Sequence, residues 1–449
     1  MGRLFGTDGV RGIANRELTA ELAFSLGQAG AAVLSRHTNQ KTKIVIGKDT
    51  RISGDMLEAA LVAGICSVGA EAVIAGVVPT PAIAHAVRLL GASAGIVISA
   101  SHNSMEYNGI KFFNAEGYKL NDEIEDEIES IILDGKDGIT LPINEGLGVT
   151  SQRFDLKDDY IDFAKSTAWT DLSGMKIALD CANGASFAVA APVFEQLGAE
   201  VCVINNTPDG TNINANCGST HIEGLQKLVA ETGADIGLAF DGDADRVLAA
   251  DENGVLVDGD KIMSICGMHM KQNGKLTNNT IVATVMSNLG LFIMGDTNGI
   301  NIAKTKVGDR YVIEEMKEKG HSLGGEQSGH IIFLEHNTTG DGIVTGVQLA
   351  CVLKDSGAKL SALAEIMQVM PQVLLNAKVK NENKNSYLEN DMIKMEIEKI
   401  EQYFSGKGRV LIRPSGTEPL VRVMIEGSDI GFITEKAKYL ATLIETELG

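Results

Sequence analysis

The feature that most constrains the fold is a strand–turn–helix unit that occurs three times along the chain. Each unit begins with a short apolar run that enters a polar or glycine-containing turn and then a helical segment, at residues 43–47, 176–180 and 280–284. Each also contains a glycine that ends a helix before another β-rich run, at Gly69, Gly198 and, more loosely, Gly299. Strands that alternate with helices favour mixed or largely parallel sheets covered by helices. We therefore expect three α/β domains of similar plan, with ligands at the loops that follow strands.

Changes in composition along the chain predict the domain boundaries. A chain of 449 residues predicts roughly three domains of about 150 residues. The first boundary is expected in the stretch 134–150, which follows an acidic helical segment, and the others near 251–254 and 370–371. Beyond these lie a polar segment typical of a helix, at 381–399, and then a strand, loop, strand and helix. We predict domains at residues 1–150, 151–252, 253–370 and 371–449, the last being a smaller α+β domain.

Charge and cysteine usage limit the partners of the chain. The formal net charge of −20 argues against a nucleic-acid or anionic membrane partner. The amino-terminal sequence has no apolar signal core, and the apolar region 59–90 is interrupted by charged residues and prolines. The six cysteines are scattered without metal-type spacing, which favours reduced thiols. These observations predict a cytoplasmic protein that binds neither nucleic acid nor membrane.

Three carboxylates are crowded into residues 241–246, DGDADR in one-letter code, directly after the apolar run 236–240. Two carboxylates a few Å apart repel by roughly 4 kcal/mol at the effective dielectric of a protein surface, so this loop is expected to hold a divalent cation. A calcium EF-hand fits the aspartate spacing together with Glu252, but its sixth position requires glycine and holds Arg246. A solvated acidic hairpin turn is the other alternative. The sequence favours a metal site between two strands.

Two further loops follow apolar runs and carry polar groups. Residues 99–104, SASHNS, offer hydroxyls, an imidazole and an amide, although an ordinary polar turn also fits. Downstream, Lys111 lies on an apolar strand, where it could either snorkel to solvent or meet a phosphate. Residues 324–330, GGEQSGH, form a glycine-hinged loop in which the carboxylate of Glu326 suits sugar hydroxyls. A capping turn is the alternative for this loop.

A third loop, residues 413–419 with the sequence RPSGTEP, lies between two predicted strands. Its hydroxyls, glycine and arginine, together with Arg422, resemble a phosphate-binding nest by composition, since the arginine fork matches phosphate oxygens better than lysine does. A proline-rich turn with incidental arginines is the alternative.

Together these loops resemble those of the phosphohexose mutase (α-D-phosphohexomutase) family, in the same order and over the whole chain. FGTDGVRG at residues 5–12 matches the first signature of the family. Its phosphoserine, metal, sugar and phosphate loops are matched by residues 99–103, 241–246, 325–330 and 413–419. TKVGDR at 305–310 and GEQSGH at 325–330 are closest to members that interconvert glucosamine 6-phosphate and glucosamine 1-phosphate. In the family, that reaction feeds UDP-N-acetylglucosamine and cell-wall synthesis.

The resemblance implies four domains around a central cleft, each of which lends one loop. Ser101 would be the phosphorylated nucleophile, and the ligands of one Mg²⁺ would be Asp241, Asp243, Asp245 and a phosphate oxygen on Ser101. The transferring phosphoryl group would be surrounded by His102, Lys111 and Arg246, with either His102 or Lys111 as acid or base. The residues that would bind substrate are Arg11, Lys306, Glu326, Ser328, His330, Arg413, Ser415, Gly416, Thr417 and Arg422.

The implied reaction passes the phosphoryl group from Ser101 to the sugar monophosphate and gives a 1,6-bisphosphate, which turns around and returns its other phosphate. Hexosamine phosphates are thus the expected small-molecule partners, and the sugar 1,6-bisphosphate is the expected intermediate and activator. The resemblance also implies that the chain could form a homodimer. One departure is Ser104, where the family usually has proline. Without proline the loop is expected to be more mobile, and Ser104 is an alternative nucleophile.

Other functions fit the same loops. A phosphomannomutase or phosphoglucomutase would use the same machinery, and a 2-amino group and a 2-hydroxyl group are similar in size and both form hydrogen bonds. A metal-dependent sugar phosphatase would pass the phosphoryl group to water. A non-catalytic sugar-phosphate sensor would keep the loop at Arg413 but lose the nucleophile or the metal ligands, which this chain retains.

Overall fold

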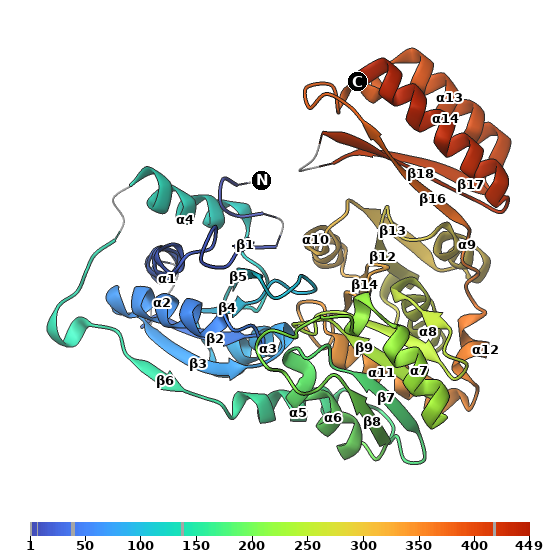
Figure 1. The fold of residues 1–449 in the computed structure, drawn as a ribbon. Coiled ribbons are helices and arrows are strands. Elements are labelled where there is room, and N and C mark those ends of the chain that lie inside the picture. The colour runs from blue at the N-terminus through green and yellow to red at the C-terminus, as the bar shows by residue number, and fades with distance from the viewer. Residues whose placement is uncertain (1, 7, 37–40, 136–138, 416–418) are drawn as a thin grey trace. The chain divides into compact units, whose positions relative to one another are not determined.

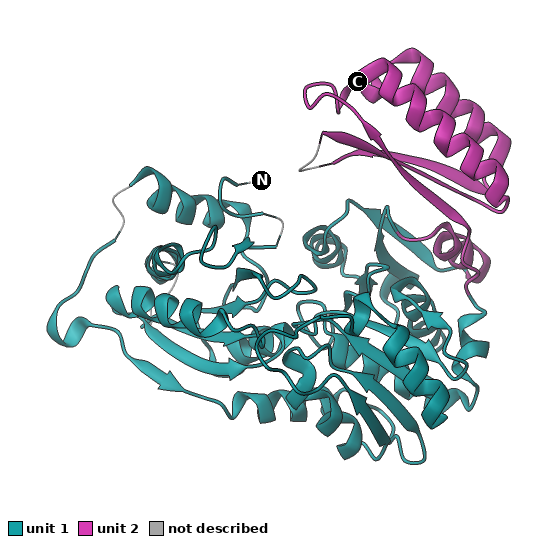
Figure 2. Ribbon diagram, viewed as in Figure 1, with its two compact units in different colours: residues 1–286, 299–366 teal, residues 287–298, 367–449 magenta. Residues whose placement is uncertain are grey.

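The computed structural model describes residues 2–6, 8–36, 41–135, 139–415 and 419–449. The chain divides into two compact units, residues 1–286 with 299–366 and residues 287–298 with 367–449 (Figure 2). In the part of the chain that is described, no helix is both long enough and apolar enough to cross a membrane.

The first sheet of the larger unit has six strands in the order β1-β5-β4-β2-β3-β6 (Figure 1). Its strands are β1 (Val10–Ile13), β2 (Lys43–Lys48), β3 (Glu71–Val77), β4 (Ala94–Ile98), β5 (Tyr107–Phe113) and β6 (Thr150–Gln152). β2, β3, β4 and β6 run parallel, whereas β5 pairs antiparallel with both β4 and β1. Its helices are α1 (Ala20–Ser35), α2 (Gly54–Ser67), α3 (Thr80–Leu90) and α4 (Asp122–Asp134). α1 and α2 approach so closely that a Cβ at Gly64 would lie 2.2 Å from the Phe24 carbonyl oxygen.

The second sheet has five strands in the order β11-β10-β9-β7-β8. They are β7 (Lys176–Asp180), β8 (Glu200–Ile204), β9 (Ile236–Phe240), β10 (Val247–Asp251) and β11 (Leu256–Val257). β7 is parallel to β8 and β9, and β10 is antiparallel to β9 and β11. The helices of this part are α5 (Leu156–Ser166), α6 (Ala190–Gln196) and α7 (Glu223–Thr232).

The third sheet has the order β13-β12-β14-β15. Its strands are β12 (Thr280–Thr284), β13 (Asn301–Thr305), β14 (Leu323–Gly325) and β15 (Ile331–Phe333). β12 is parallel to β13 and β14, and β15 is antiparallel to β14. Its helices within the larger unit are α8 (Gly259–Gln272), α10 (Asp309–Lys319), α11 (Gly342–Ser356) and α12 (Leu360–Ala364). Single 3-10 turns are at Asn144–Gly146, Ala185–Ala188, Gly218–Thr220, Thr277–Asn279 and Ser386–Leu388.

The predicted threefold repeat is confirmed by the strands that occupy corresponding places. β2, β7 and β12 each lie between two parallel neighbours. The three repeated glycines all have a left-handed backbone, with φ of 87° at Gly69, 96° at Gly198 and 62° at Gly299. Glycine takes this conformation without a Cβ clash, so it can end a helix and turn the chain into the next strand.

The smaller unit has a three-stranded antiparallel sheet in the order β16-β18-β17. Its strands are β16 (Gln372–Lys378), β17 (Gly408–Pro414) and β18 (Leu420–Gly427), and its helices are α9 (Leu289–Asn298), α13 (Asp391–Phe404) and α14 (Ile430–Leu448). The predicted strands and helix after Gly408 are confirmed as β17, β18 and α14, and residues 416–418 of the predicted loop lie outside the described residues. The helix predicted from residue 381 is wrong at its start, because α13 begins only at Asp391. Asn381, Asn383 and Asn385 favour turns, and Asn390 caps α13 by accepting hydrogen bonds from two helical N–H groups.

Three α/β sheets and a smaller α+β part confirm the predicted fold class. The four domain ranges stay a prediction. β6 begins at Thr150 and joins the first sheet, and β11 at Leu256–Val257 joins the second. The sheets therefore extend a few residues past positions 150 and 252.

Candidate active site

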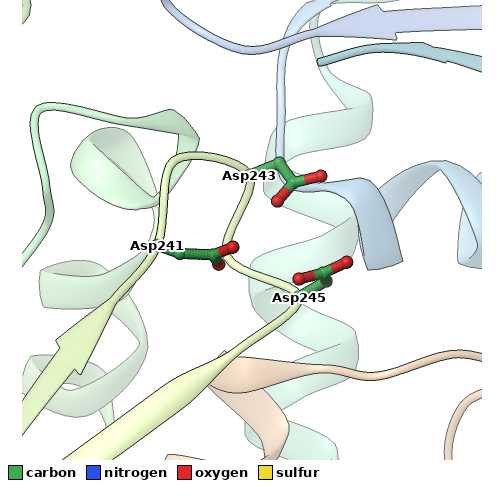
Figure 3. Close-up of side chains that lie close together, drawn as sticks. All are labelled: Asp241, Asp243 and Asp245. Atoms are coloured by element: carbon green, nitrogen blue, oxygen red, sulfur yellow. The ribbon is translucent and has the colours of Figure 1, made fainter. Parts of the chain in front are cut away.

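The three aspartates of residues 241–246, here called the acidic turn, lie on the connection between β9 and β10 (Figure 3). All three are buried, and their ligand oxygens lie within 4.8 Å of one another. Ala244 closes the turn with a left-handed backbone, φ 56°, and its N–H donates to the Asp241 carbonyl oxygen at 3.1 Å. The predicted arrangement of strand, acidic turn and strand is confirmed.

Charge and burial suit the acidic turn to a divalent cation. Burial, together with the charges of Asp245 and Asp243, raises the pKa of Asp241 well above its usual range. The Oδ1 atoms of Asp243 and Asp245 are buried and have no hydrogen-bond partner among the described residues. Crowded carboxylate oxygens that lack donors form the kind of ligand set that Mg²⁺ and Ca²⁺ take. The side chains that are present therefore fit the predicted metal.

The structure brings Ser101 to the acidic turn. Ser101 lies on the loop between β4 and β5, residues 99–106, here called the serine loop, and its side chain is buried. Its Oγ donates to Asp241 Oδ2 at 2.7 Å. The two loops touch closely, because a Cβ at Gly242 would lie 2.5 Å from the Ser101 carbonyl oxygen. Ser104 is exposed, so Ser101 is the better candidate nucleophile.

Lys111 lies on β5 with its ammonium among three carboxylates. Its Nζ is 2.8 Å from an oxygen of Asp243, 3.1 Å from one of Asp8 and 3.7 Å from one of Asp245. Burial alone would lower the pKa of Lys111, but these carboxylates raise it above its usual value. Lys111 therefore stays a cation in this site.

His102 lies between Ser101 and Arg246 in a chain of close polar contacts. His102 Nδ1 is 3.2 Å from Ser101 Oγ and 3.2 Å from Arg246 Nη1. Burial and the nearby positive charges of Arg246 and Arg11 lower the pKa of His102 to about 4. The imidazole is consequently neutral at neutral pH. Arg246 stays charged, because Asp245 and Asp241 raise its pKa against the effect of burial.

Four side chains for which no role was predicted complete this polar cluster: Asp8, Thr80, Lys119 and Asp309. Lys119 Nζ bonds the carboxylates of both Asp8 and Asp309, and Thr80 Oγ1 donates to Asp243 Oδ2 at 2.7 Å. Asp8 and Asp309 lie inside the motifs at residues 5–12 and 305–310. Their place in these motifs is the sequence signal that points to a role in the site. Thr80 and Lys119 lie outside all of the sequence motifs described above.

Several predicted substrate residues surround this cluster. Arg11 pairs with Asp8, and His330 is buried, with Nε2 3.4 Å from Asp309 Oδ2 and neither ring nitrogen hydrogen-bonded within the described chain. His330 also pairs with Arg246 in a β-bridge, which joins the sugar loop to the acidic turn.

The other predicted sugar-binding groups are more accessible. Glu326 is half-buried, and its Oε1 accepts the Gly308 N–H at 3.2 Å. Ser328 is exposed. Lys306 is also exposed, with its Nζ 5.7 Å from the centre of the Tyr311 ring.

The predicted phosphate loop belongs to the smaller unit. Arg413 on β17 and Arg422 on β18 are register partners, and Ser415 is buried. Burial and the charge of Arg422 lower the pKa of Arg413. Like charges placed directly opposite on neighbouring strands are destabilising, and a bound anion offsets that repulsion. Gly416 and Thr417 lie outside the described residues.

Family models match nearly the whole chain. They are described as phosphoglucomutase/phosphomannomutase alpha/beta/alpha domains I, II and III, at residues 2–138, 158–254 and 258–370, and as the C-terminal domain, at residues 374–435. Among solved structures, a phosphoglucomutase/phosphomannomutase family protein from Burkholderia thailandensis aligns with a TM-score of 0.81. The two are 24% identical, and the alignment covers 98% of this chain and 97% of the other. That likeness shows a common fold.

Curated relatives are much more similar in sequence. The phosphoglucosamine mutase of Acetivibrio thermocellus is 65% identical over 449 residues, which is 100% of both chains. The phosphoglucosamine mutase of Clostridium acetobutylicum is 62% identical over 445 residues, or 99% of each chain. The chain therefore belongs to the phosphoglucomutase/phosphomannomutase family, the phosphohexose mutases, and groups within it with the phosphoglucosamine mutases.

Proposed function

We propose that the chain interconverts glucosamine 6-phosphate and glucosamine 1-phosphate through a phosphoserine at Ser101 and a 1,6-bisphosphate intermediate. The observation that carries the chemistry is the 2.7 Å contact between Ser101 Oγ and Asp241 in a cluster of three buried carboxylates. The relatives named phosphoglucosamine mutase, 60% to 65% identical over almost the whole chain, support the choice of sugar.

The metal of this proposal is Mg²⁺, held by Asp241, Asp243, Asp245 and a phosphate oxygen on Ser101. When bound, it cancels negative charge between the carboxylates and the phosphate and polarises the phosphoryl group. The buried Oδ1 atoms of Asp243 and Asp245 that lack donors support this assignment. Lys111 and Arg246 add fixed positive charge beside the same carboxylates.

In the first half-reaction the bond between Ser101 Oγ and phosphorus breaks while phosphorus bonds the free hydroxyl oxygen of the sugar monophosphate. The sugar hydroxyl proton passes to a base, the protonated base gives a proton to the departing Ser101 oxygen, and Ser101 ends as a free hydroxyl. In the second half-reaction the other phosphate of the bisphosphate returns to Ser101 by the same steps in reverse. Phosphoryl transfer depends mainly on positioning and charge stabilisation, which the buried cluster provides.

We assign the base role to His102 rather than Lys111. A base must be unprotonated before it acts, and the carboxylates around Lys111 keep it a cation. His102 is neutral at neutral pH, and its Nδ1 lies 3.2 Å from Ser101 Oγ, beside the oxygen that exchanges the phosphoryl group.

The remaining predicted residues serve recognition in this proposal. The site must bind the bisphosphate in two orientations. Glu326, Ser328 and His330 therefore contact the sugar through hydrogen bonds that can form in both orientations. Arg413 and Arg422, with Ser415, Gly416 and Thr417, are the proposed phosphate-binding residues of the smaller unit. The cross-strand pairing of the two arginines supports this role.

Steady-state rates on three sugars test the proposed substrate. With a catalytic amount of the matching 1,6-bisphosphate, kcat/KM for glucosamine 6-phosphate should exceed that for glucose 6-phosphate and mannose 6-phosphate by about tenfold or more. The reverse ranking would identify a phosphoglucomutase or phosphomannomutase. Release of inorganic phosphate in place of the isomer would identify a phosphatase, and phosphate release should be measured in the same reactions.

A further inference from the structure

A buried arginine lies beneath the serine loop and uses its whole guanidinium group there. Arg51 follows β2, and its side chain has 0% exposure. A guanidinium carries five N–H donors in a fixed plane. Nε donates to Asp49, Nη1 donates to the carbonyl oxygens of Ser104 and Tyr107, and Nη2 donates to those of Ser101 and Asn103. Five acceptors thus match five donors, and four of them are backbone carbonyls at or beside the serine loop.

Asp49 sets the orientation of this guanidinium. One oxygen of Asp49 accepts the Arg51 N–H at 3.0 Å, and the other accepts Arg51 Nε at 2.9 Å. The second oxygen also accepts the Ser99 hydroxyl at 2.6 Å, and Ser99 Oγ in turn accepts the Ser101 N–H at 2.9 Å. The backbone N–H and C=O of Ser101 are therefore both tied to the pair formed by Asp49 and Arg51.

Ser101 needs this support because its backbone is left-handed, with φ of 53°. Non-glycine residues in that region persist where surrounding contacts hold them. Rotation of the backbone would swing Ser101 Oγ away from Asp241, and small displacements of a reacting group are costly to catalysis. Asn214 adds a second donor to the carbonyl oxygens of Ser101 and Asn103, at 2.9 and 3.0 Å.

We propose that Arg51 is a positioning residue that holds the serine loop in the geometry for phosphoryl transfer. This inference rests on the proposed phosphoserine chemistry. Arg51 acts through the loop backbone and is not itself a catalytic residue.

The variant Arg51→Lys tests this proposal, because lysine keeps the charge but offers three donors that do not spread in a plane. We expect kcat to fall by about 50-fold or more while KM stays within about threefold, since the loop and not the substrate site is altered. The loss of the phosphoryl group from the phosphorylated variant in the first half-reaction with the sugar is followed by intact mass, and its rate should fall by the same factor as kcat.

A second substitution separates loop positioning from general stability. The Ser104 N–H donates no hydrogen bond within the described chain, so Ser104→Pro removes no bond to the backbone. Proline restricts the loop, and we expect Ser104→Pro to raise kcat of Arg51→Lys by about two- to fivefold while changing the wild type by less than about twofold. Because proline can also stabilise a folded chain in general, the thermal melting temperature of each variant is measured beside kcat, and the gain in kcat should exceed what the gain in folded fraction explains.

Two further variants keep the test decisive. Arg88→Lys, in α3, alters a guanidinium that bonds the Ala84 carbonyl and Asn337, and it should keep kcat within about twofold. If Arg51→Lys does not fold, Ser99→Ala removes only one hydroxyl of the same network and should lower kcat by about tenfold at unchanged KM.

The proposal is wrong if folded Arg51→Lys, or Ser99→Ala in its place, keeps kcat within threefold of the wild type. It is also wrong if the substitution raises KM and leaves kcat unchanged. A third contrary result would be that Ser104→Pro restores none of the kcat lost in Arg51→Lys. Any hexose monophosphate that discharges the wild-type phosphoserine can be used. A wild type that is never discharged would instead refute the proposed function.

Discussion

Replacement of Ser101 by alanine is expected to lower kcat by on the order of 10⁴- to 10⁶-fold, as removal of a nucleophile does in other enzymes. The substitution removes the oxygen that carries the phosphoryl group in both half-reactions. It also leaves Asp241 Oδ2 without the donor at 2.7 Å, at a cost of about 1–3 kcal/mol in the free energy of unfolding. The fold should persist, and a thermal melt together with an assay for glucosamine 1-phosphate measures both effects.

Ser104→Ala is the matched control, because it removes a hydroxyl from the same loop. Ser104 is exposed, so this variant should keep most of the wild-type rate. If the two results were exchanged, Ser104 would be the nucleophile. If neither variant lost activity, the serine loop would not take part in the chemistry.

Asp245→Asn is the second change with a large expected effect. Its Oδ1 has no hydrogen-bond partner among the described residues, and its ion-pair distances to Lys111 and Arg246 are 3.7 and 3.8 Å. The substitution therefore disturbs few contacts while it removes a metal-binding charge. We expect kcat to fall by about 10²-fold or more and the Mg²⁺ concentration for half-maximal activity to rise by about tenfold or more. A titration of activity with Mg²⁺ measures both values.

Glu252→Gln is the control for this metal site. Glu252 would be the ligand at the twelfth position of an EF-hand loop, but its side chain bonds the backbone N–H and hydroxyl of Ser361. The Mg²⁺ titration of Glu252→Gln should match that of the wild type. A shift as large as that of Asp245→Asn would revive the EF-hand alternative, and an unshifted Asp245→Asn would remove the acidic turn from metal binding.

The fold could be predicted largely from local patterns. The apolar runs that became β2, β7 and β12 and the glycines with positive φ are short-range signals, and they were sufficient for three α/β parts of one plan. The polar run from residue 381 becomes helical only at Asp391, because its asparagines compete for backbone hydrogen bonds in turns, and helical composition alone does not show where a helix begins.

The candidate site was predictable only where its residues share a loop. Three aspartates within five positions indicate a cation by themselves. In contrast, the partners of Lys119 lie 111 and 190 residues away, at Asp8 and Asp309. The carbonyl acceptors that Arg51 bonds at or beside the serine loop lie 50 to 56 residues away. Such pairs depend on how sheets bring distant loops together, which no local pattern specifies.

The intact mass of the phosphorylated chain, measured before and after the first half-reaction with glucosamine 6-phosphate and quenched before the bisphosphate returns a phosphate, tests the central claim most directly. The account predicts that the chain loses one phosphoryl group from Ser101 and that glucosamine 1,6-bisphosphate appears in solution in equal amount. An unchanged mass, or recovery of the lost group as inorganic phosphate, would contradict it.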